Sequence, residues 1–326
     1  MFSQQVLDIE PVATIADISN AIRRQVLQQL KRRGVVVGLS GGIDSSVVAA
    51  LAVRALGASR VIGLLMPDRA SADDSLRLGQ AMATALGIEA IVEDIAPVLA
   101  AAGCYQRQAQ AIRLVFPDYV DGDPFKIILP SILSTERLNV ARLTVKDQTG
   151  HERTASMRLE ANLQLVAATN FKQRVRKMLE YYHADRLHYA VSGTPNRLEY
   201  DQGFFVKQGD GAADFKPIAH LYKTQVYALA ASLDVPDEIR RRPPTTDTFP
   251  MEQTQAEFYF SLPYQHMDLC LYASNHGVAA ADVAPVVGLT TEQVERVFRD
   301  IEQKRRATRY LHTPPLVVHS VAEVAP

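Results

Sequence analysis

The sequence predicts an α/β protein with a doubly wound parallel sheet, flanked by helices and carrying a small hairpin insertion. Two observations carry this prediction. Short apolar, β-branched runs alternate with helical patterns, which favours parallel strands joined by right-handed crossovers. The first run, Val35–Val37, leads through a glycine-rich loop into an alanine- and valine-rich helix. Because ligands bind at the carboxyl ends of parallel strands, we expect the functional site at that loop.

Length and composition fit one large domain that buries its own core. The chain has 326 residues, of which 47% are hydrophobic, and a net charge of −1. This charge gives no general reason to expect nucleic acid or an anionic membrane as a partner. Cys104 and Cys270 are far apart, so neither a zinc site nor a disulfide framework is indicated. No signal peptide or membrane-length apolar run is present, and we expect a soluble, cytoplasmic protein.

Residues 1–34 are predicted to form one amphipathic helix that covers a sheet edge or a partner subunit. Its expected apolar side consists of Ile15, Ile18, Ile22, Val26, Leu27 and Leu30. After the glycine-rich loop we expect a helix over 47–56, a strand over 61–66, a helix over 72–86 closed by Gly87, and a strand over 91–95. This order continues the alternation that a parallel sheet requires.

Residues 116–158 break the alternation of strands and helices. The acidic stretch 116–124 lacks the ligand order of a calcium loop, so a surface loop is the better interpretation. Residues 142–146 and 151–157 alternate in polarity and flank the turn sequence 147–150. We therefore expect a β-hairpin here.

The second half of the chain repeats the strand-to-loop pattern. A long helix over 159–183 is followed by a buried strand over 187–193, whose end carries Thr194, Asn196 and Glu199. A hydroxyl, an amide and a carboxylate should therefore lie beside the first loop. Residues 203–217 are too rich in glycine and charge for a core element, a helix follows from 221 to before Pro236, and 250–326 form a C-terminal helical part with a basic tail.

The loop Ser40-Gly41-Gly42-Ile43-Asp44-Ser45 has the character of a phosphate site. Glycines let an anion approach the backbone, and the helix dipole adds positive charge. The loop lacks both the Gly-Lys-Ser/Thr of the Walker motif and the spacing of the dinucleotide fingerprint. It resembles the pyrophosphate-binding loop (PP-loop) of the N-type ATP pyrophosphatases. The alternative, an ordinary glycine turn, leaves the full string unexplained.

With the remaining motifs, the chain resembles the ammonia-using NAD synthetase family over roughly residues 15–312. The strings that carry this resemblance are Gly-Leu-Ser-Gly-Gly-Ile-Asp-Ser at 38–45, Arg-Val-Arg-Lys-Met at 174–178, Gly-Thr-Pro-Asn-Arg-Leu-Glu at 193–199, Gly-Phe-Phe-Val-Lys-Gln-Gly-Asp-Gly-Ala-Ala-Asp at 203–214, Leu-Tyr-Lys-Thr-Gln-Val at 221–226, Pro-Pro-Thr-Thr-Asp at 243–247, and Gln303-Lys304-Arg305-Arg306. The resemblance implies an adenine nucleotide alpha-hydrolase-like, Rossmann-like fold and a single synthetase domain over 1–326.

The family adenylates deamido-NAD with ATP and lets ammonia attack, giving NAD, AMP and pyrophosphate. The resemblance implies that Asp44 and Lys223 are catalytic and that Asp44 and Glu199 bind Mg²⁺. It implies ATP contacts from Gly38, Leu39, Ser40, Gly41, Gly42, Ile43, Asp44, Ser45, Thr194, Lys223 and Thr245. It implies deamido-NAD contacts from Arg174, Lys207, Asp214, Gln303 and Lys304. Since the substrate carboxylate is itself the nucleophile, no side-chain nucleophile is needed, and positioning and charge neutralisation supply the catalysis.

The resemblance also implies a homodimer whose dinucleotide sites draw on both subunits. The chain carries no leading glutaminase domain, so free ammonia, or ammonia from a separate glutaminase subunit, is the expected nitrogen donor. Residues 116–158 are longer than expected for compact relatives, and residues 243–255 continue differently after their start. These two departures lie near the expected substrate or dimer regions.

Three alternatives remain at this point. Another PP-loop amide ligase or amidotransferase, such as GMP synthetase or asparagine synthetase, would act on a different acid, but it would not predict the 203–214 string. A regulatory nucleotide-binding module would not need Asp44, Glu199 and Lys223 together. Nucleic-acid binding through 240–242 or 304–306 is disfavoured by the neutral overall charge.

Overall fold

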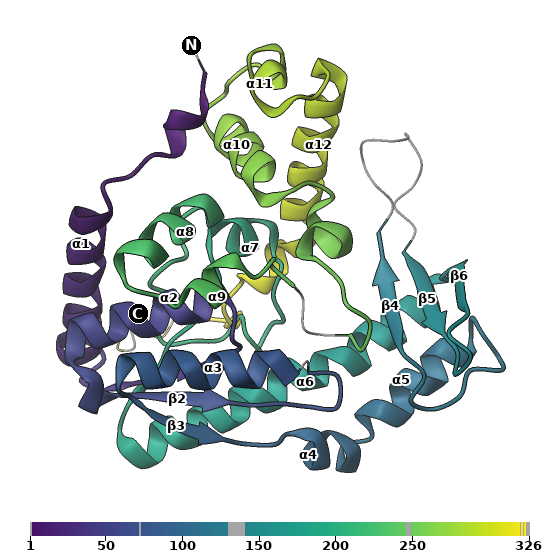
Figure 1. Ribbon diagram of the computed structural model, residues 1–326, viewed down its shortest axis with the longest axis horizontal. Helices are drawn as coiled ribbons and strands as arrows, with labels where there is room; N and C mark the ends of the chain where they lie inside the picture. Colours follow the sequence, from purple (N-terminus) through teal and green to yellow (C-terminus); the bar gives the residue numbers. More distant parts are fainter. Residues whose placement is uncertain are drawn as a thin grey trace.

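The computed structural model describes residues 2–71, 73–129, 141–245, 249–319, 321 and 323. The larger of its sheets has four parallel strands in the order β3-β2-β1-β7. Its strands are β1 (Val35–Gly38), β2 (Val61–Leu65), β3 (Glu89–Val92) and β7 (Ala190–Val191). Figure 1 shows β2 and β3 beside α3 (Asp73–Leu86). Val35 pairs with both Val61 and Ala190, so β1 is an inner strand. The predicted parallel sheet is confirmed.

Helices cover both faces of the sheet because successive side chains of each strand point to opposite sides. Val35, Val37 and Val61 pack against one group of helices, whereas Val36 and Ile62 pack against another. The first group is α1 (Pro11–Arg23), α2 (Ile43–Leu56), α3 (Asp73–Leu86) and α8 (Lys223–Ser232), and the second is α4 (Ala96–Ala101), α5 (Cys104–Arg113) and α6 (Leu159–Leu187). Strands β1, β2 and β7 are therefore buried between two helical layers, whereas β3, at the edge of the sheet, is partly exposed.

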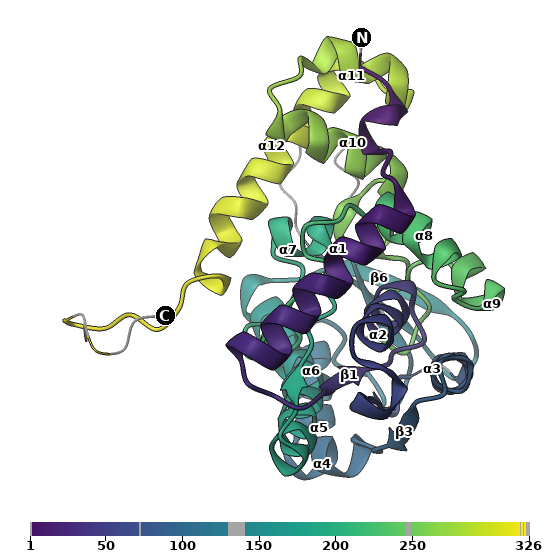
Figure 2. The ribbon, with the colours of Figure 1, turned by 90° about the vertical axis from the view of Figure 1, so that its left-hand side faces the viewer.

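The N-terminal segment differs from the single helix predicted for residues 1–34. A 3₁₀ turn, η1 (Gln4–Leu7), comes first, and α1 begins only at Pro11 and continues through a π-helical turn, η2 (Arg24–Gln29). Pro11 suits the first helical position because its missing N–H would have no partner there. The predicted apolar side is buried from Ile15 to Val26, but α1 packs against α2 and α8 rather than a sheet edge (Figure 2).

Several predicted bounds shift by a few residues. β3 covers 89–92 rather than 91–95 because Glu89 and Ala90 pair with β2, while Ile95 is buried at the start of α4. The helix predicted over 159–183 extends to Leu187, so that β7 retains only two residues. Ala72, the first residue of the predicted helix before Gly87, lies outside the described residues. So do 130–140, 246–248 and part of the tail.

Within the segment 116–158, the described residues form a three-stranded antiparallel sheet, β4-β5-β6. The predicted hairpin is confirmed as β5 (Arg142–Lys146) and β6 (Glu152–Ser156). The sequence did not predict β4 (Phe125–Ile128), which pairs with β5 and directly follows the acidic loop. Its Phe125 and Ile127 are buried against α5 and α6 in a separate core.

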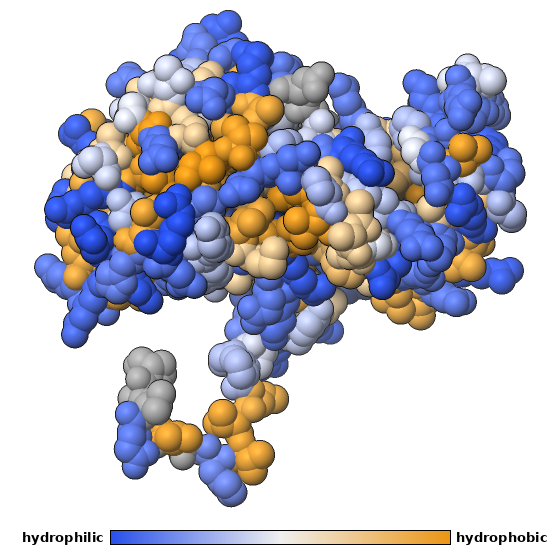
Figure 3. Space-filling model, turned by 90° about the horizontal axis from the view of Figure 1, so that it is seen from below, coloured by the Kyte–Doolittle hydropathy of each residue, from blue (hydrophilic) through white to orange (hydrophobic). Residues whose placement is uncertain are grey.

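The C-terminal part is helical, as predicted. It contains α9 (Asp237–Arg241), η4 (Ala256–Phe260), α10 (Tyr264–Asn275), α11 (Ala280–Val287), α12 (Thr291–Thr308) and η5 (Arg309–Leu311). Helices α10–α12 share an apolar core with α7 (Arg197–Gln202) and η1. After η5 the chain projects from the body with apolar side chains in the open, Leu316 being 89% exposed (Figures 2 and 3). No helix of the described residues is long and apolar enough to cross a membrane.

Candidate active site

The glycine-rich loop connects the end of β1 to α2 at the carboxyl edge of the sheet. Gly41 has a φ of 73°, and a Cβ on it would lie 2.5 Å from the Ser75 carbonyl oxygen. The hydroxyls of Ser45 and Ser46 donate to the Gly42 carbonyl at 3.1 and 2.9 Å, which fixes the turn from within. No side chain caps α2, so its positive N-terminus is available to an anion.

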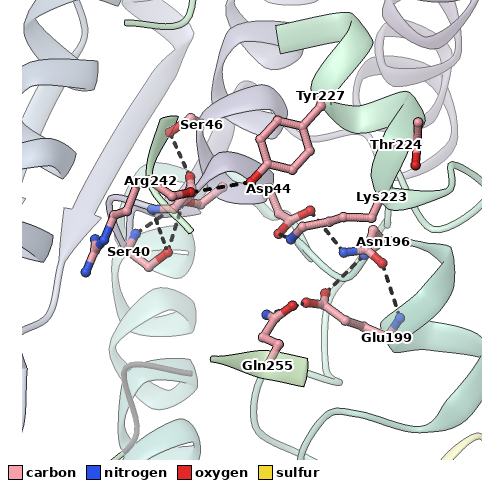
Figure 4. Close-up of polar contacts among 12 residues, drawn as sticks. Ser40, Asp44, Ser46, Asn196, Glu199, Lys223, Thr224, Tyr227, Arg242 and Gln255 are labelled. Atoms are coloured by element: carbon pink, nitrogen blue, oxygen red, sulfur yellow. Dashed lines mark hydrogen bonds and ion pairs between the residues drawn. The ribbon is translucent and has the colours of Figure 1, made fainter. Parts of the chain in front are cut away.

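Asp44 lies in the first turn of α2 and joins two other segments of the chain (Figure 4). Its Oδ1 accepts a hydrogen bond from Asn196 Nδ2 at 3.0 Å, and its Oδ2 forms an ion pair with Lys223 Nζ. Lys223 is the first residue of α8 and only 2% exposed. Burial opposes a charge on Lys223, but the carboxylates of Asp44 and Glu199 outweigh it and raise the pKa of this ammonium above its ordinary value.

Glu199 faces the same point from α7. Asn196 caps this helix through a capping box, in which Glu199 Oε2 accepts the Asn196 N–H at 3.3 Å. The other carboxylate oxygen of Glu199, Oε1, accepts a hydrogen bond from Gln255 Nε2 at 3.0 Å. Burial and the negative charge of Asp44 raise the pKa of Glu199 to about 7. Two carboxylates that repel each other across one lysine form a site suited to a cation.

A cavity of about 610 Å³ opens beside these residues. Of the eleven residues predicted to contact ATP, ten line it: Gly38, Leu39, Ser40, Gly42, Ile43, Asp44, Ser45, Thr194, Lys223 and Thr245. Gly41 does not line it, since it packs against Ser75. Arg242, Arg176 and Lys177 also line it, the last paired with Glu180 of the same wall at 2.6 Å. Segments far apart in the sequence thus meet at one edge of the sheet, as the topology predicted.

The donor set fits Mg²⁺. This ion is commonly held by one or two carboxylates, with water and phosphate oxygens completing its shell. Asp44 and Glu199 supply two carboxylates beside the phosphate loop. Among the described residues, this site included, no group of three or more His, Cys, Asp or Glu residues is arranged to bind a metal, so water and phosphate oxygens would have to complete the shell.

The five residues predicted to contact deamido-NAD lie outside this cavity. Arg174 and Lys207 are neighbours, because Arg174 Nε donates to the Lys207 carbonyl at 3.4 Å. The Lys207 ammonium donates to the carbonyls of Tyr310 and Thr313 at 2.7 and 3.0 Å. The pair therefore lies where the C-terminal tail leaves the body.

The other three predicted contacts are separate from that pair. Asp214 accepts the Val191 N–H at 2.7 Å, which places it at the edge of β7. Lys304 donates to the Tyr259 carbonyl at 2.7 Å and pairs with Asp300 at 2.6 Å, while Gln303 is exposed on α12. Asp214 and Lys304 thus already have partners within the chain.

Sequence reasoning assigned no role to several residues of the site. Asn196 was placed at the correct edge, and its Asn-x-x-Glu spacing to Glu199 was a usable capping signal. Gln255 and Tyr227 gave no such signal. Arg242 reaches Ser75 Oγ at 3.0 Å, and its backbone carbonyl accepts from Tyr227 at 3.5 Å. These contacts bridge segments that only the fold brings together.

A parallel sheet with a glycine loop at β1, and with two carboxylates around a buried lysine, defines a nucleotide-binding protein of the PP-loop class. Solved structures share this fold. The NMN synthetase from Francisella tularensis has a TM-score of 0.64 at 22% identity, covering 95% of this chain and 99% of its own. The NH3-dependent NAD synthetase from Campylobacter jejuni has a TM-score of 0.59 at 22% identity, covering 95% of this chain and 100% of its own.

Sequence comparisons define the family. The model of the NAD synthase family matches residues 14–116 and 133–311. A relative from Mesorhizobium japonicum, an NH(3)-dependent NAD(+) synthetase, is 59% identical over 318 residues, which cover 98% of this chain and 100% of the relative. A relative of the same name from Thermotoga neapolitana is 34% identical over 92% of this chain and 97% of its own. The chain belongs to the NAD synthase family.

Proposed function

We propose that the protein is an ammonia-dependent NAD synthetase, a ligase that converts deamido-NAD, ATP and ammonia into NAD, AMP and pyrophosphate. The observation that carries this proposal is the convergence of Asp44, Glu199 and Lys223 beside the glycine loop. Membership of the family and the 59% identical relative support it.

In the first half-reaction an oxygen of the nicotinate carboxylate attacks the α-phosphorus of ATP, and pyrophosphate leaves. In the second, ammonia attacks the acyl carbon and AMP leaves as its bond to that carbon breaks. The N-terminus of α2 and the hydroxyls of Thr194 and Thr245 orient the nucleotide, and the Lys223 ammonium stabilises the negative charge that develops on it. Asp44 and Glu199 would hold Mg²⁺, which neutralises pyrophosphate charge when it is bound.

We place the dinucleotide at the outer side of α6, where Arg174 and Lys207 are neighbours, with Asp214, Gln303 and Lys304 as further contacts. This position supports a homodimer. The exposed side of α6 carries Leu159, Leu163, Met178 and Tyr182, which are 72%, 59%, 54% and 59% exposed. An apolar helix face of this kind is typical of a subunit interface. A second copy on α6 would border both subunits' Arg174 residues, as shared dinucleotide sites require.

Free ammonia is the proposed nitrogen donor, and the cytoplasm is the proposed location. The two cysteines, Cys104 and Cys270, are free and buried, which suits a reducing compartment.

The test is to incubate the purified protein with ATP, Mg²⁺, ammonium and deamido-NAD. We expect NAD, AMP and pyrophosphate in equal amounts, and none of them when deamido-NAD is omitted. Parallel reactions with nicotinic acid mononucleotide test whether the adenylate half of the substrate is needed. Release of ADP, or AMP formation with a different acid only, would contradict the proposal.

A further inference from the structure

The strand β4 belongs to a segment that the family pattern leaves out. The family model matches up to residue 116 and again from 133, and β4 (Phe125–Ile128) lies between the two parts. Besides pairing with β5, the strand receives hydrogen bonds from a distant segment. The Met251 N–H donates to the Phe125 carbonyl at 3.4 Å, and Gln253 Nε2 donates to the Ile127 carbonyl at 2.5 Å.

Aromatic packing reinforces this contact. The rings of Phe125 and Phe249 lie 5.7 Å apart, edge to face, and those of Phe249 and Phe258 lie 5.4 Å apart. Phe249 and Gln253 are 5% and 3% exposed. The segment 249–258 is thus held on β4 by buried contacts of both kinds, which fix it more tightly than a surface loop.

The same segment carries the outer partner of Glu199. Thr254 forms an isolated antiparallel β-bridge with Thr245, and the Gln255 N–H donates to the Pro244 carbonyl at 3.1 Å. The Gln255 side chain donates from Nε2 to Glu199 Oε1 at 3.0 Å. Thr245 and Gln255 both line the nucleotide cavity. A single residue, Thr254, therefore separates Gln253, which contacts β4, from Gln255, which contacts the proposed metal-binding carboxylate.

We propose that β4, which lies between the two stretches that the family model matches, supports the active site, and that Gln253 is a positioning residue that holds Gln255 against Glu199 and Thr245 against the nucleotide. This inference rests on the proposed function, because that function assigns Mg²⁺ to Glu199 and ATP to Thr245. A carboxylate that binds a metal keeps its orientation through such outer hydrogen bonds, and losing them typically weakens metal binding or activity. This part of the chain thereby contributes to the nucleotide site in two ways: Ile127, Leu129 and Ala141 line the cavity directly, and β4 holds the segment 249–258 that carries Gln255.

The test measures ATP binding with Mg²⁺ by calorimetry, without deamido-NAD, for the variants Gln253→Met, Gln255→Ala and the double variant. Methionine keeps the volume of glutamine but removes the N–H that Ile127 accepts. We expect Gln255→Ala to weaken ATP binding about tenfold, as loss of an outer partner does. Gln253→Met should weaken it in the same direction, and the double variant should bind no more weakly than Gln255→Ala within a factor of about two, because both act on one contact.

Thr144→Val is the matched control. Thr144 is 2% exposed and its hydroxyl lies 2.8 Å from that of Thr154, so the substitution removes a buried hydrogen bond of the same small sheet without touching residues 249–258. Its thermal midpoint should fall, while its ATP affinity and KM for ATP remain those of the unaltered protein. Wild-type ATP binding by Gln253→Met, additive losses in the double variant, or an equal loss in Thr144→Val would overturn the inference. Absence of NAD formation by the unaltered protein would refute the function while leaving this binding test readable.

Discussion

Lys223 sets the charge balance of the site because it is the cation that faces both Asp44 and Glu199. Its side chain is 2% exposed, and removing it leaves two partly buried carboxylates, Asp44 and Glu199, in mutual repulsion. In the proposed mechanism, Asp44 and Glu199 would hold the metal ion, and the Lys223 ammonium would then be available to the phosphates of ATP.

We predict that Lys223→Met lowers kcat/KM by about 100-fold or more, the usual cost of losing one charge-stabilising donor. Steady-state NAD formation measures this loss. Lys146→Met, at an exposed position on β5, is the control and should retain full activity. Near-normal turnover by Lys223→Met would remove the catalytic role assigned to it.

Asp268 holds the helix that carries Lys223. It is fully buried on α10, and its Oδ2 accepts both the N–H and the hydroxyl of Thr224 at 2.7 Å. Burial raises its pKa to about 6, against an ordinary value of 3.8, despite these hydrogen bonds. The folded protein therefore binds this proton more tightly than the unfolded chain, and the resulting stabilisation is lost as the pH rises through about 6.

Asp268→Asn should remove this pH dependence while its side-chain oxygen still accepts from Thr224. We predict that the variant gains stability relative to the unaltered protein between pH 5 and pH 8, because only the latter must ionise a buried carboxyl. Urea unfolding at the two pH values measures the change. The prediction fails if the stability difference between the two proteins is the same at both.

At the scale of elements, the loop between β1 and α2 depends on one close approach. Gly41→Ala would add a Cβ 2.5 Å from the Ser75 carbonyl, in addition to its cost at a φ of 73°. We predict that it abolishes measurable ATP binding in calorimetry. Gly87→Ala is the control, since Gly87 has a φ of 63° with no atom within 4 Å, and it should cost about 1–2 kcal/mol of stability with ATP affinity retained. Equal ATP affinity in both variants would contradict the steric argument.

The elements that sequence predicted well have local causes. The run Val35–Val37, the glycines after it and the apolar helix α2 are adjacent in the chain, so their pattern is sufficient. β4 was missed because it has four residues, follows an irregular loop and depends on partners at 142–145 and 249–253. Gln255 was missed for the same reason, since its contact with Glu199 spans 56 positions. Motif resemblance predicted residues for both ligands. Ten of the eleven residues predicted to contact ATP line one cavity, whereas the five predicted to contact the dinucleotide lie outside it.

At the scale of the whole molecule, the apolar face of α6 determines the proposed assembly. We predict that Met178→Glu converts the dimer to a monomer, because a charge in an apolar interface loses its hydration without gaining a partner. Light scattering after size-exclusion chromatography measures the mass. Val12→Glu, at a 74% exposed position on α1, is the control and should remain a dimer. A dimer in both variants would place the interface elsewhere.

The hold of Lys207 on the carbonyls of Tyr310 and Thr313 has a practical consequence for handling the protein. A C-terminal affinity tag would follow a segment that is bonded, at Tyr310 and Thr313, to Lys207, a proposed dinucleotide contact. Such a tag could disturb this contact. Phe2 packs beside Tyr272 of α10, which is not among the residues assigned to either substrate. Amino-terminal tagging is therefore the sounder choice for every affinity measurement described above.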